Sequence, residues 1–71
     1  MPRLPRISGQ EAIQALKKLG FDEARQKGSH VVLRKDHIGC VIPLHKELKV
    51  GTLAGALRQA DVSVEEFLSA L

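Results

Sequence analysis

The segment RQKGSHVVLR, residues 25–34, contains the turn and the strand around which the chain is organised. Gly28 can adopt the positive φ angles that other residues avoid, and Ser29 is small and polar, so the pair predicts a sharp reversal. The residues that follow are aliphatic and β-branched, which predicts a strand over His30–Arg34. The turn therefore places one imidazole, that of His30, at the beginning of a strand.

Two further strands are predicted on either side of this one. Residues 21–27 have mixed polarity and no helical apolar stripe, which favours an edge strand. The turn-prone Lys35-Asp36-His37 predicts a second hairpin, and a third strand should run from Gly39 to Pro43. The chain thus predicts three consecutive antiparallel strands.

Side chains alternate along a strand, and this decides where the histidine points. His30, Val32 and Arg34 share one face of the second strand, while Val31 and Leu33 share the other. If the aliphatic pair faces the helices, His30 lies on the open face, where a substrate can reach it. Histidine takes and gives a proton near neutral pH, so it is a candidate general base or acid. A structural histidine with satisfied hydrogen bonds is the alternative that the residue type leaves open.

Three helices are predicted around the strands. Ser8 and Glu11 have the spacing of a capping box, and Gly20 is a natural C-terminal cap, which predicts a helix over 9–19. The second helix follows a loop at 44–51 and carries an apolar stripe, and Thr52 or Gly51 is its expected cap. Gly55 within it is expected to pack tightly, because glycine otherwise costs about 1 kcal/mol in a helix.

The third helix is short and also has a capping box, from Ser63 to Glu66, with Val62 and Phe67 placed as a hydrophobic staple. The predicted order is helix, three antiparallel strands, helix, short helix. The fold class is therefore α+β, in two layers, with both main helices on one face of the sheet. Residues 1–71 are expected to form a single domain, preceded by an extended arm over 1–7 that contains two prolines and two arginines.

Composition and charge exclude one mode of nucleic-acid binding and favour a ligand that carries phosphates. The chain has no Trp, no Tyr and two Phe, which excludes base stacking on aromatic side chains as the main means of holding nucleic acid. The net charge is +6 over residues 1–58 and −3 over residues 59–71. A basic body of this kind is expected of a domain that approaches phosphates, although lysines scattered on a solvated surface would give the same excess.

The single cysteine and the apolar runs indicate the compartment. Cys40 cannot form an internal disulfide, which favours a reduced, cytoplasmic setting, and no apolar run approaches the ~18 residues that cross a bilayer. The spacing of Cys40 and the histidines His30, His37 and His45 matches no tetrahedral zinc pattern. We therefore expect no membrane association and no metal. No small-molecule cofactor is expected either.

The chain resembles the HicA (YcfA-like) family of bacterial and archaeal toxin ribonucleases, over almost its whole length. The resemblance rests on four segments in order: Gly20-Phe21, Arg25-Gln26-Lys27-Gly28-Ser29-His30, Ile42-Pro43-Leu44-His45 and Lys49-Val50-Gly51-Thr52-Leu53. It implies a fold like that of double-stranded-RNA-binding domains, metal-independent cleavage of mRNA, and a catalytic role for His30. It also implies inhibition by a HicB-type antitoxin protein.

The basic residues around the histidine are the candidate RNA contacts. Helix N-termini attract anions, so the loop before the second helix is one source of contacts, and the residues flanking the turn are another. The candidates are Arg25, Lys27, Ser29, Arg34, His45, Lys46 and Lys49. Two other classes remain open: a non-catalytic module that binds double-stranded RNA by shape, and a domain that docks an acidic protein.

Overall fold

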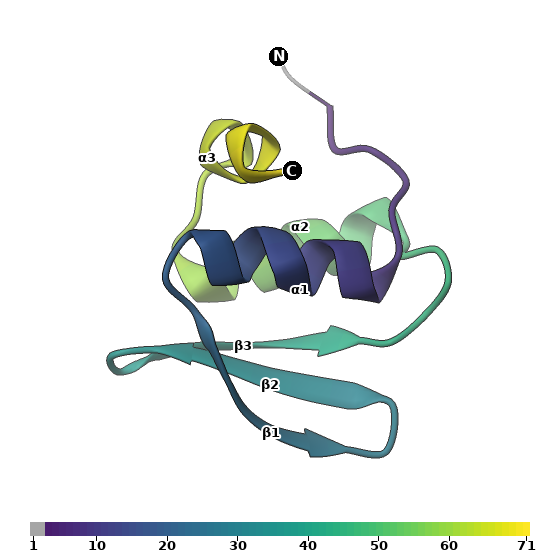
Figure 1. Cartoon of the computed structure of the whole chain (residues 1–71). Coiled ribbons are helices and arrows are strands. Elements are labelled where there is room, and N and C mark those ends of the chain that lie inside the picture. The colour runs from purple at the N-terminus through teal and green to yellow at the C-terminus, as the bar shows by residue number, and fades with distance from the viewer. Residues whose placement is uncertain (1–2) are drawn as a thin grey trace.

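The computed structural model describes residues 3–71, so Met1 and Pro2 of the predicted arm lie outside the described residues. Three strands form one antiparallel sheet in the order β1-β2-β3, and the helices lie on one face of it (Figure 1). The elements are α1 (Gly9–Lys18), β1 (Asp22–Lys27), β2 (His30–Lys35), β3 (Ile38–Pro43), α2 (Val50–Ala60) and α3 (Val64–Ala70). The predicted two-layer α+β fold is confirmed.

Tight turns join the strands and set their register. Gly28 has φ 60° in the β1–β2 turn, and Asp36 has φ 56° in the β2–β3 turn. His30 pairs with Lys27 on β1 and with Pro43 on β3. The pairing of β1 and β2 shifts between Glu23 and Arg25, and all of β1 is exposed, as predicted for an edge strand.

Burial alternates along β2 as the sequence predicts. Val31 and Leu33 face the helices and are buried, whereas His30 and Arg34 are exposed and Val32 is half-buried. The sheet therefore has one covered face and one open face, and His30 belongs to the open one.

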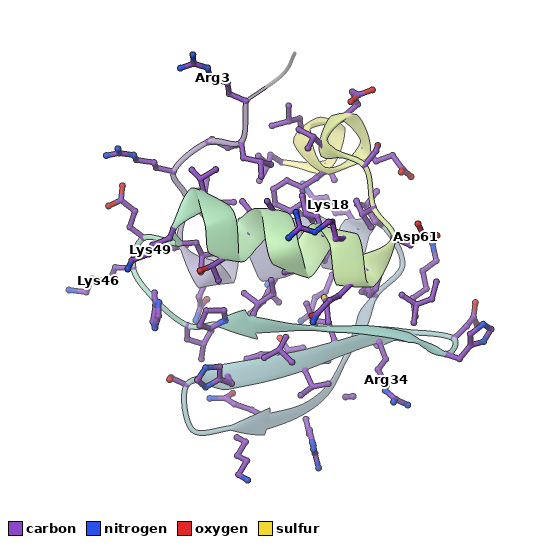
Figure 2. The ribbon with its side chains drawn as sticks, turned by 180° about the vertical axis from the view of Figure 1, so that it is seen from behind. Arg3, Lys18, Arg34, Lys46, Lys49 and Asp61 are labelled. Atoms are coloured by element: carbon purple, nitrogen blue, oxygen red, sulfur yellow. The ribbon has the colours of Figure 1, made fainter. Side chains whose placement is uncertain are left out.

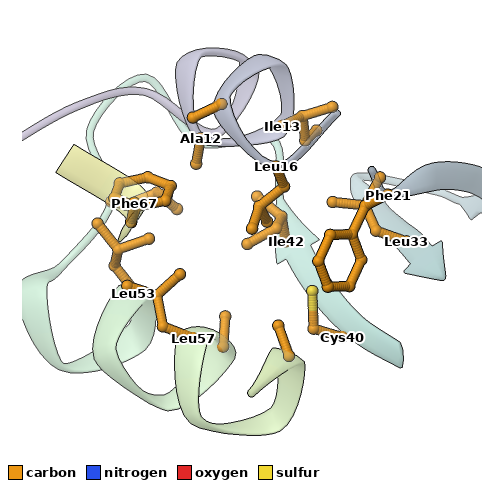
Figure 3. Packing of buried hydrophobic residues seen from close by; sticks show 14 of the residues in the cluster. Ala12, Ile13, Leu16, Phe21, Leu33, Cys40, Ile42, Leu53, Leu57 and Phe67 are labelled. Carbon is orange, nitrogen blue, oxygen red and sulfur yellow. The ribbon is translucent and has the colours of Figure 1, made fainter. Parts of the chain in front are cut away.

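The core lies between the covered face of the sheet and the helices. α2 packs chiefly on β3, α1 contacts both α3 and β3, and α3 closes the core with the fully buried Phe67. Burial of aliphatic side chains supplies most of the stability of so small a chain. The largest fully buried side chains are Phe67, Leu16, Leu33, Ile42, Leu48 and Leu53, several of which are seen together in Figure 3.

Both predicted capping boxes are present. The Ser8 amide donates to Glu11 Oε1, and the Glu11 amide donates to Ser8 Oγ, each at 3.1 Å. Ser63 and Glu66 repeat the same pair of bonds at 3.1 Å. Each box satisfies two amides that a helix N-terminus leaves without partners, so α1 and α3 begin where the local sequence says they should.

The predicted cap of the second helix is wrong. α2 begins at Val50, and its N-cap is Lys49, whose side chain makes no capping hydrogen bond. The buried Leu48 anchors the preceding loop to the core, and Lys49 keeps an extended backbone with ψ 139°. Helical geometry can therefore begin before Gly51 and Thr52 are reached.

The glycine that packs tightly is also not the predicted one. A Cβ on Gly55 would meet only the Arg58 guanidinium, at 3.8 Å, so no close contact requires a glycine there. A Cβ on Gly9 would instead collide with the carbonyl oxygen of Pro43. Gly9 lets the start of α1 approach the end of β3 more closely than any other residue would.

Among residues 3–71, no helix has the length and apolar character needed to cross a bilayer.

Candidate active site

His30 is exposed at the start of β2, between Lys27 and Pro43 on the neighbouring strands. Directly paired residues in an antiparallel sheet have Cβ atoms about 5 Å apart, so the Lys27 ammonium can reach the space above the imidazole. Within the described part of the chain, no hydrogen bond or ion pair involves the His30 side chain. The imidazole is therefore not a structural histidine with satisfied hydrogen bonds.

Three backbone hydrogen bonds link the β3–α2 loop to segments distant in the sequence, one of them the turn before His30. The Leu44 amide donates to the Ser29 carbonyl oxygen at 2.6 Å, which fixes the β3–α2 loop to the β1–β2 turn. The Gly9 amide donates to the His45 carbonyl oxygen at 2.9 Å, and the Leu48 amide donates to the Ile7 carbonyl oxygen at 2.7 Å. The turn, the loop, the arm and the start of α1 consequently meet at one end of the molecule (Figure 1).

Most of the predicted RNA contacts lie at this end, which we call the histidine end. Ser29 precedes His30 in the turn, Lys27 lies opposite it, and His45, Lys46 and Lys49 are exposed on the tied loop. Figure 2 shows Lys46 and Lys49 together at one side of the molecule. The uncapped N-terminus of α2 adds its free amides to this group of cations, and such a terminus favours an anion.

Two of the predicted contacts lie elsewhere. Arg34 is on the same face as His30 but four residues further along β2, roughly 13 Å away at the rise of a strand. Figure 2 shows it at the side of the molecule opposite Lys46 and Lys49. Arg25 pairs with Val32 and lies between the two ends of the open face. The structure therefore gathers Lys27, but not Arg34, around the histidine.

A comparison with known families identifies the chain. The family described as the HicA toxin of bacterial toxin–antitoxin systems matches residues 9–62. The chain belongs to the HicA toxin family. It is thus the toxin of a toxin–antitoxin pair and has an antitoxin as its partner. No curated protein matches it closely enough to be named as a relative.

The HicA match covers α1 through α2 and therefore contains His30 and its loop, whereas the arm and α3 lie outside it. The sequence alone indicates no role for the arm. In the fold, Arg6 and Lys49 line one surface cavity of about 340 Å³ at the histidine end. The apolar residues Leu4 and Ile7 on either side of Arg6 are the signal that the arm is docked rather than free.

Cys40 and the histidines do not come together as ligands of a metal ion in this HicA toxin. Cys40 is buried on the covered side of the sheet, and burial raises the pKa of its thiol to about 11. His30 is on the opposite face, and His37 is in the β2–β3 turn at the far end of β2. Over residues 3–71 no three His, Cys, Asp or Glu side chains are placed to hold one metal ion.

Proposed function

We propose that this HicA toxin is an endoribonuclease that cleaves mRNA without a metal, with His30 as general base. The imidazole takes the proton of a ribose 2′-hydroxyl, and that oxygen attacks the adjacent phosphorus. The bond from phosphorus to the 5′ oxygen breaks, the 5′ oxygen takes up a proton, and a 2′,3′-cyclic phosphate remains. Because RNA supplies its own nucleophile, the reaction needs only a positioned base, an acid and positive charge.

The observation that carries this proposal is the free, exposed imidazole of His30. A structural histidine would have at least one ring nitrogen in a hydrogen bond within the protein, whereas none of the hydrogen bonds of residues 3–71 involves this ring. It therefore keeps both nitrogens for a substrate. A positioned general base typically contributes about a hundred- to ten-thousand-fold to a rate.

The surrounding cations support a phosphodiester as the substrate. Lys27 lies directly across from His30, and the loop that carries His45 and Lys46 is fixed to the same turn. Positive charge aimed at the phosphate stabilises the charge that builds on its oxygens in the transition state. His45 is the candidate acid for the departing 5′ oxygen.

The rest of the proposal follows from the family and the substrate. A HicB-type antitoxin is the proposed partner, and mRNA as substrate implies action in the cytoplasm. The whole of residues 1–71 is proposed to act as one RNA-cleaving domain. No small-molecule cofactor takes part.

Incubation of purified toxin with RNA in the presence of a chelator tests the proposal. We expect wild type to cut, His30→Ala to lose activity by at least about a hundredfold, and the new 3′ ends to be cyclic phosphates. His37→Ala is the matched control, because it removes another exposed histidine from the far end of the sheet and should cut like wild type. Equal cutting by wild type and His30→Ala would refute the catalytic role. Binding without cutting by wild type would indicate an RNA-binding module instead.

A further inference from the structure

The N-terminal arm is fixed to the body of the protein. Ile7 is buried, with 8% of its surface exposed, and Leu4 packs against the core. The Leu48 amide donates to the Ile7 carbonyl oxygen at 2.7 Å, so the arm runs alongside the loop that leads into α2. The buried Ile7 directly after Arg6 holds the backbone of this arginine in a defined place.

Arg6 shares a surface cavity with Lys49. The cavity has a volume of about 340 Å³ and is lined by Arg6, Glu47, Leu48, Lys49 and Val50. Among residues 3–71 the only ion pair is that between Lys17 and Glu23. Glu47 therefore forms no ion pair with Arg6 or Lys49. The lining thus has two residues of positive charge, Arg6 and Lys49, against the one negative charge of Glu47, and this excess of positive charge favours an anion.

The cavity lies at the histidine end. The loop residues that line it follow His45 and Lys46, and this loop is joined to the turn of His30 by the bond between Leu44 and Ser29. An RNA strand whose phosphate lies at His30 carries further phosphates on both sides of the cleaved bond. A strand that continues from the turn along the tied loop would bring one of these phosphates to the arm.

We propose that Arg6 and Lys49 bind a backbone phosphate of the RNA other than the one that is cut, so that the N-terminal arm is part of the RNA-binding surface. The proposal rests on RNA being the substrate, as proposed above. Arginine suits this role because its planar fork donates two parallel hydrogen bonds to a phosphate. The contact is to the backbone and is expected to add affinity without sequence preference.

The test measures RNA binding in a background that cannot cleave. His30→Ala protein is titrated with a single-stranded RNA oligonucleotide of mixed sequence over a series of salt concentrations. We expect Arg6→Gln to weaken binding roughly five- to eightfold at about 0.1 M salt, and to lower the slope of log affinity against log salt by about 0.7 to 0.9. Arg6→Lys should restore part of the loss, because it keeps the charge but not the fork.

Arg58→Gln is the matched control. It also removes one exposed arginine, but from the last turn of α2, away from the histidine end. The proposal is overturned if Arg6→Gln binds like Arg58→Gln, or if its salt slope equals that of the parent. It is also overturned if Arg6→Gln weakens binding of the antitoxin while RNA binding is unchanged, since the arm would then be a protein interface.

Because binding is measured with His30→Ala, this result is independent of cleavage. If the wild-type toxin fails to cut RNA but Arg6→Gln still weakens RNA binding with a lower salt slope, the proposed catalysis fails and the phosphate site stands. If wild type cuts RNA but Arg6→Gln changes neither RNA binding nor the salt slope, the phosphate site fails and the proposed catalysis stands.

Discussion

The amide of Leu44 donates a hydrogen bond of 2.6 Å to the carbonyl oxygen of Ser29. Ser29 immediately precedes His30, and Leu44 immediately precedes His45, so one backbone bond holds the backbones of the two histidines close together at the histidine end. The bond forms just after the last ladder pair, His30 with Pro43, and therefore continues the pairing of β2 and β3 into the turn. The catalytic proposal depends on this continuation, because it is what brings the loop cations to the histidine.

Loss of that bond should affect cleavage more than folding. Leu44→Pro removes the donor, and Pro43 before it is already in a strand, a conformation that a following proline favours. Relative to Leu44→Ala, which removes the same half-buried side chain but keeps the amide, we expect about 1 kcal/mol lower stability and a clearly lower cleavage rate. Urea unfolding and a cleavage assay measure the two effects. Identical behaviour of the two variants would show that the bond does not organise the site.

Replacement of a glycine by alanine should have opposite effects on stability at the starts of α1 and α2. At Gly9 the added Cβ collides with the backbone of Pro43, so we expect Gly9→Ala to lower the free energy of unfolding by about 1–3 kcal/mol. At Gly51 nothing lies within 4 Å of the added Cβ, and Gly51→Ala should be neutral or stabilising by up to about 1 kcal/mol. Thermal or urea unfolding compares them. A Gly9→Ala protein as stable as Gly51→Ala would mean that α1 and β3 can separate without cost.

Features determined by neighbouring residues could be predicted from the sequence. The capping boxes at Ser8 and Ser63 each involve residues three apart, and the turn at Gly28 needs only its own φ angle, so local pattern was sufficient. The close contact of Gly9 with Pro43 joins residues far apart in the chain, and no local pattern reports it. The same limit explains why Gly55, which looks unusual inside a helix, was wrongly expected to pack tightly.

In the candidate site, too, the sequence predicts the features that depend on neighbouring residues and misses those that depend on long-range packing. Alternation along β2 placed His30 on the open face, and the structure agrees. Alternation gives the face but not the position along it, so Arg34 was grouped with His30 although four residues of strand separate them. The docking of the arm beside Lys49 depends on long-range packing of Leu4 and Ile7, which composition alone could not place.

The capping box of α3 should make stability depend on pH. The backbone amide of Ser63, together with its hydroxyl, lowers the pKa of the Glu66 carboxyl below its usual 4.5, with a smaller effect of the Lys35 charge. The folded state thus releases this proton more readily than the unfolded state, and the resulting stabilisation is present above pH 4.5 and lost as the pH falls through the lower folded value.

Glu66→Gln keeps the hydrogen-bonding geometry but does not titrate. Between about pH 6 and about pH 3 we expect the free energy of unfolding to fall more in wild type than in Glu66→Gln. Glu65→Gln controls for removal of one negative charge from the same helical turn and should follow wild type. Urea unfolding at each pH gives the values, and parallel curves for wild type and Glu66→Gln would show that the box adds no pH dependence.

The thiol of Cys40 should be unreactive in the folded protein. Only 3% of the residue is exposed, and burial raises the pKa of the thiol from 9.0 to about 11. The thiolate is the reactive species, so a disulfide reagent at neutral pH should label the native protein only as it unfolds, and the urea-unfolded protein at once. Because the unfolded thiol ionises first, stability should decline as the pH rises above 9.0. Rapid labelling under native conditions would contradict the burial of Cys40.

Two cations, one at the histidine end and one at the far end of β2, should differ in their effect on RNA binding. Lys46 is on the loop tied to the turn of His30, whereas Arg34 lies roughly 13 Å along β2 from that histidine. We expect Lys46→Gln to weaken RNA binding by His30→Ala protein and to lower its salt slope by about 0.7 to 0.9, because one phosphate contact is lost. Arg34→Gln, the matched loss of one exposed charge, should change both much less. Equal losses in the two variants would mean that RNA lies along the whole length of β2, and that the contacts are not concentrated at the histidine end.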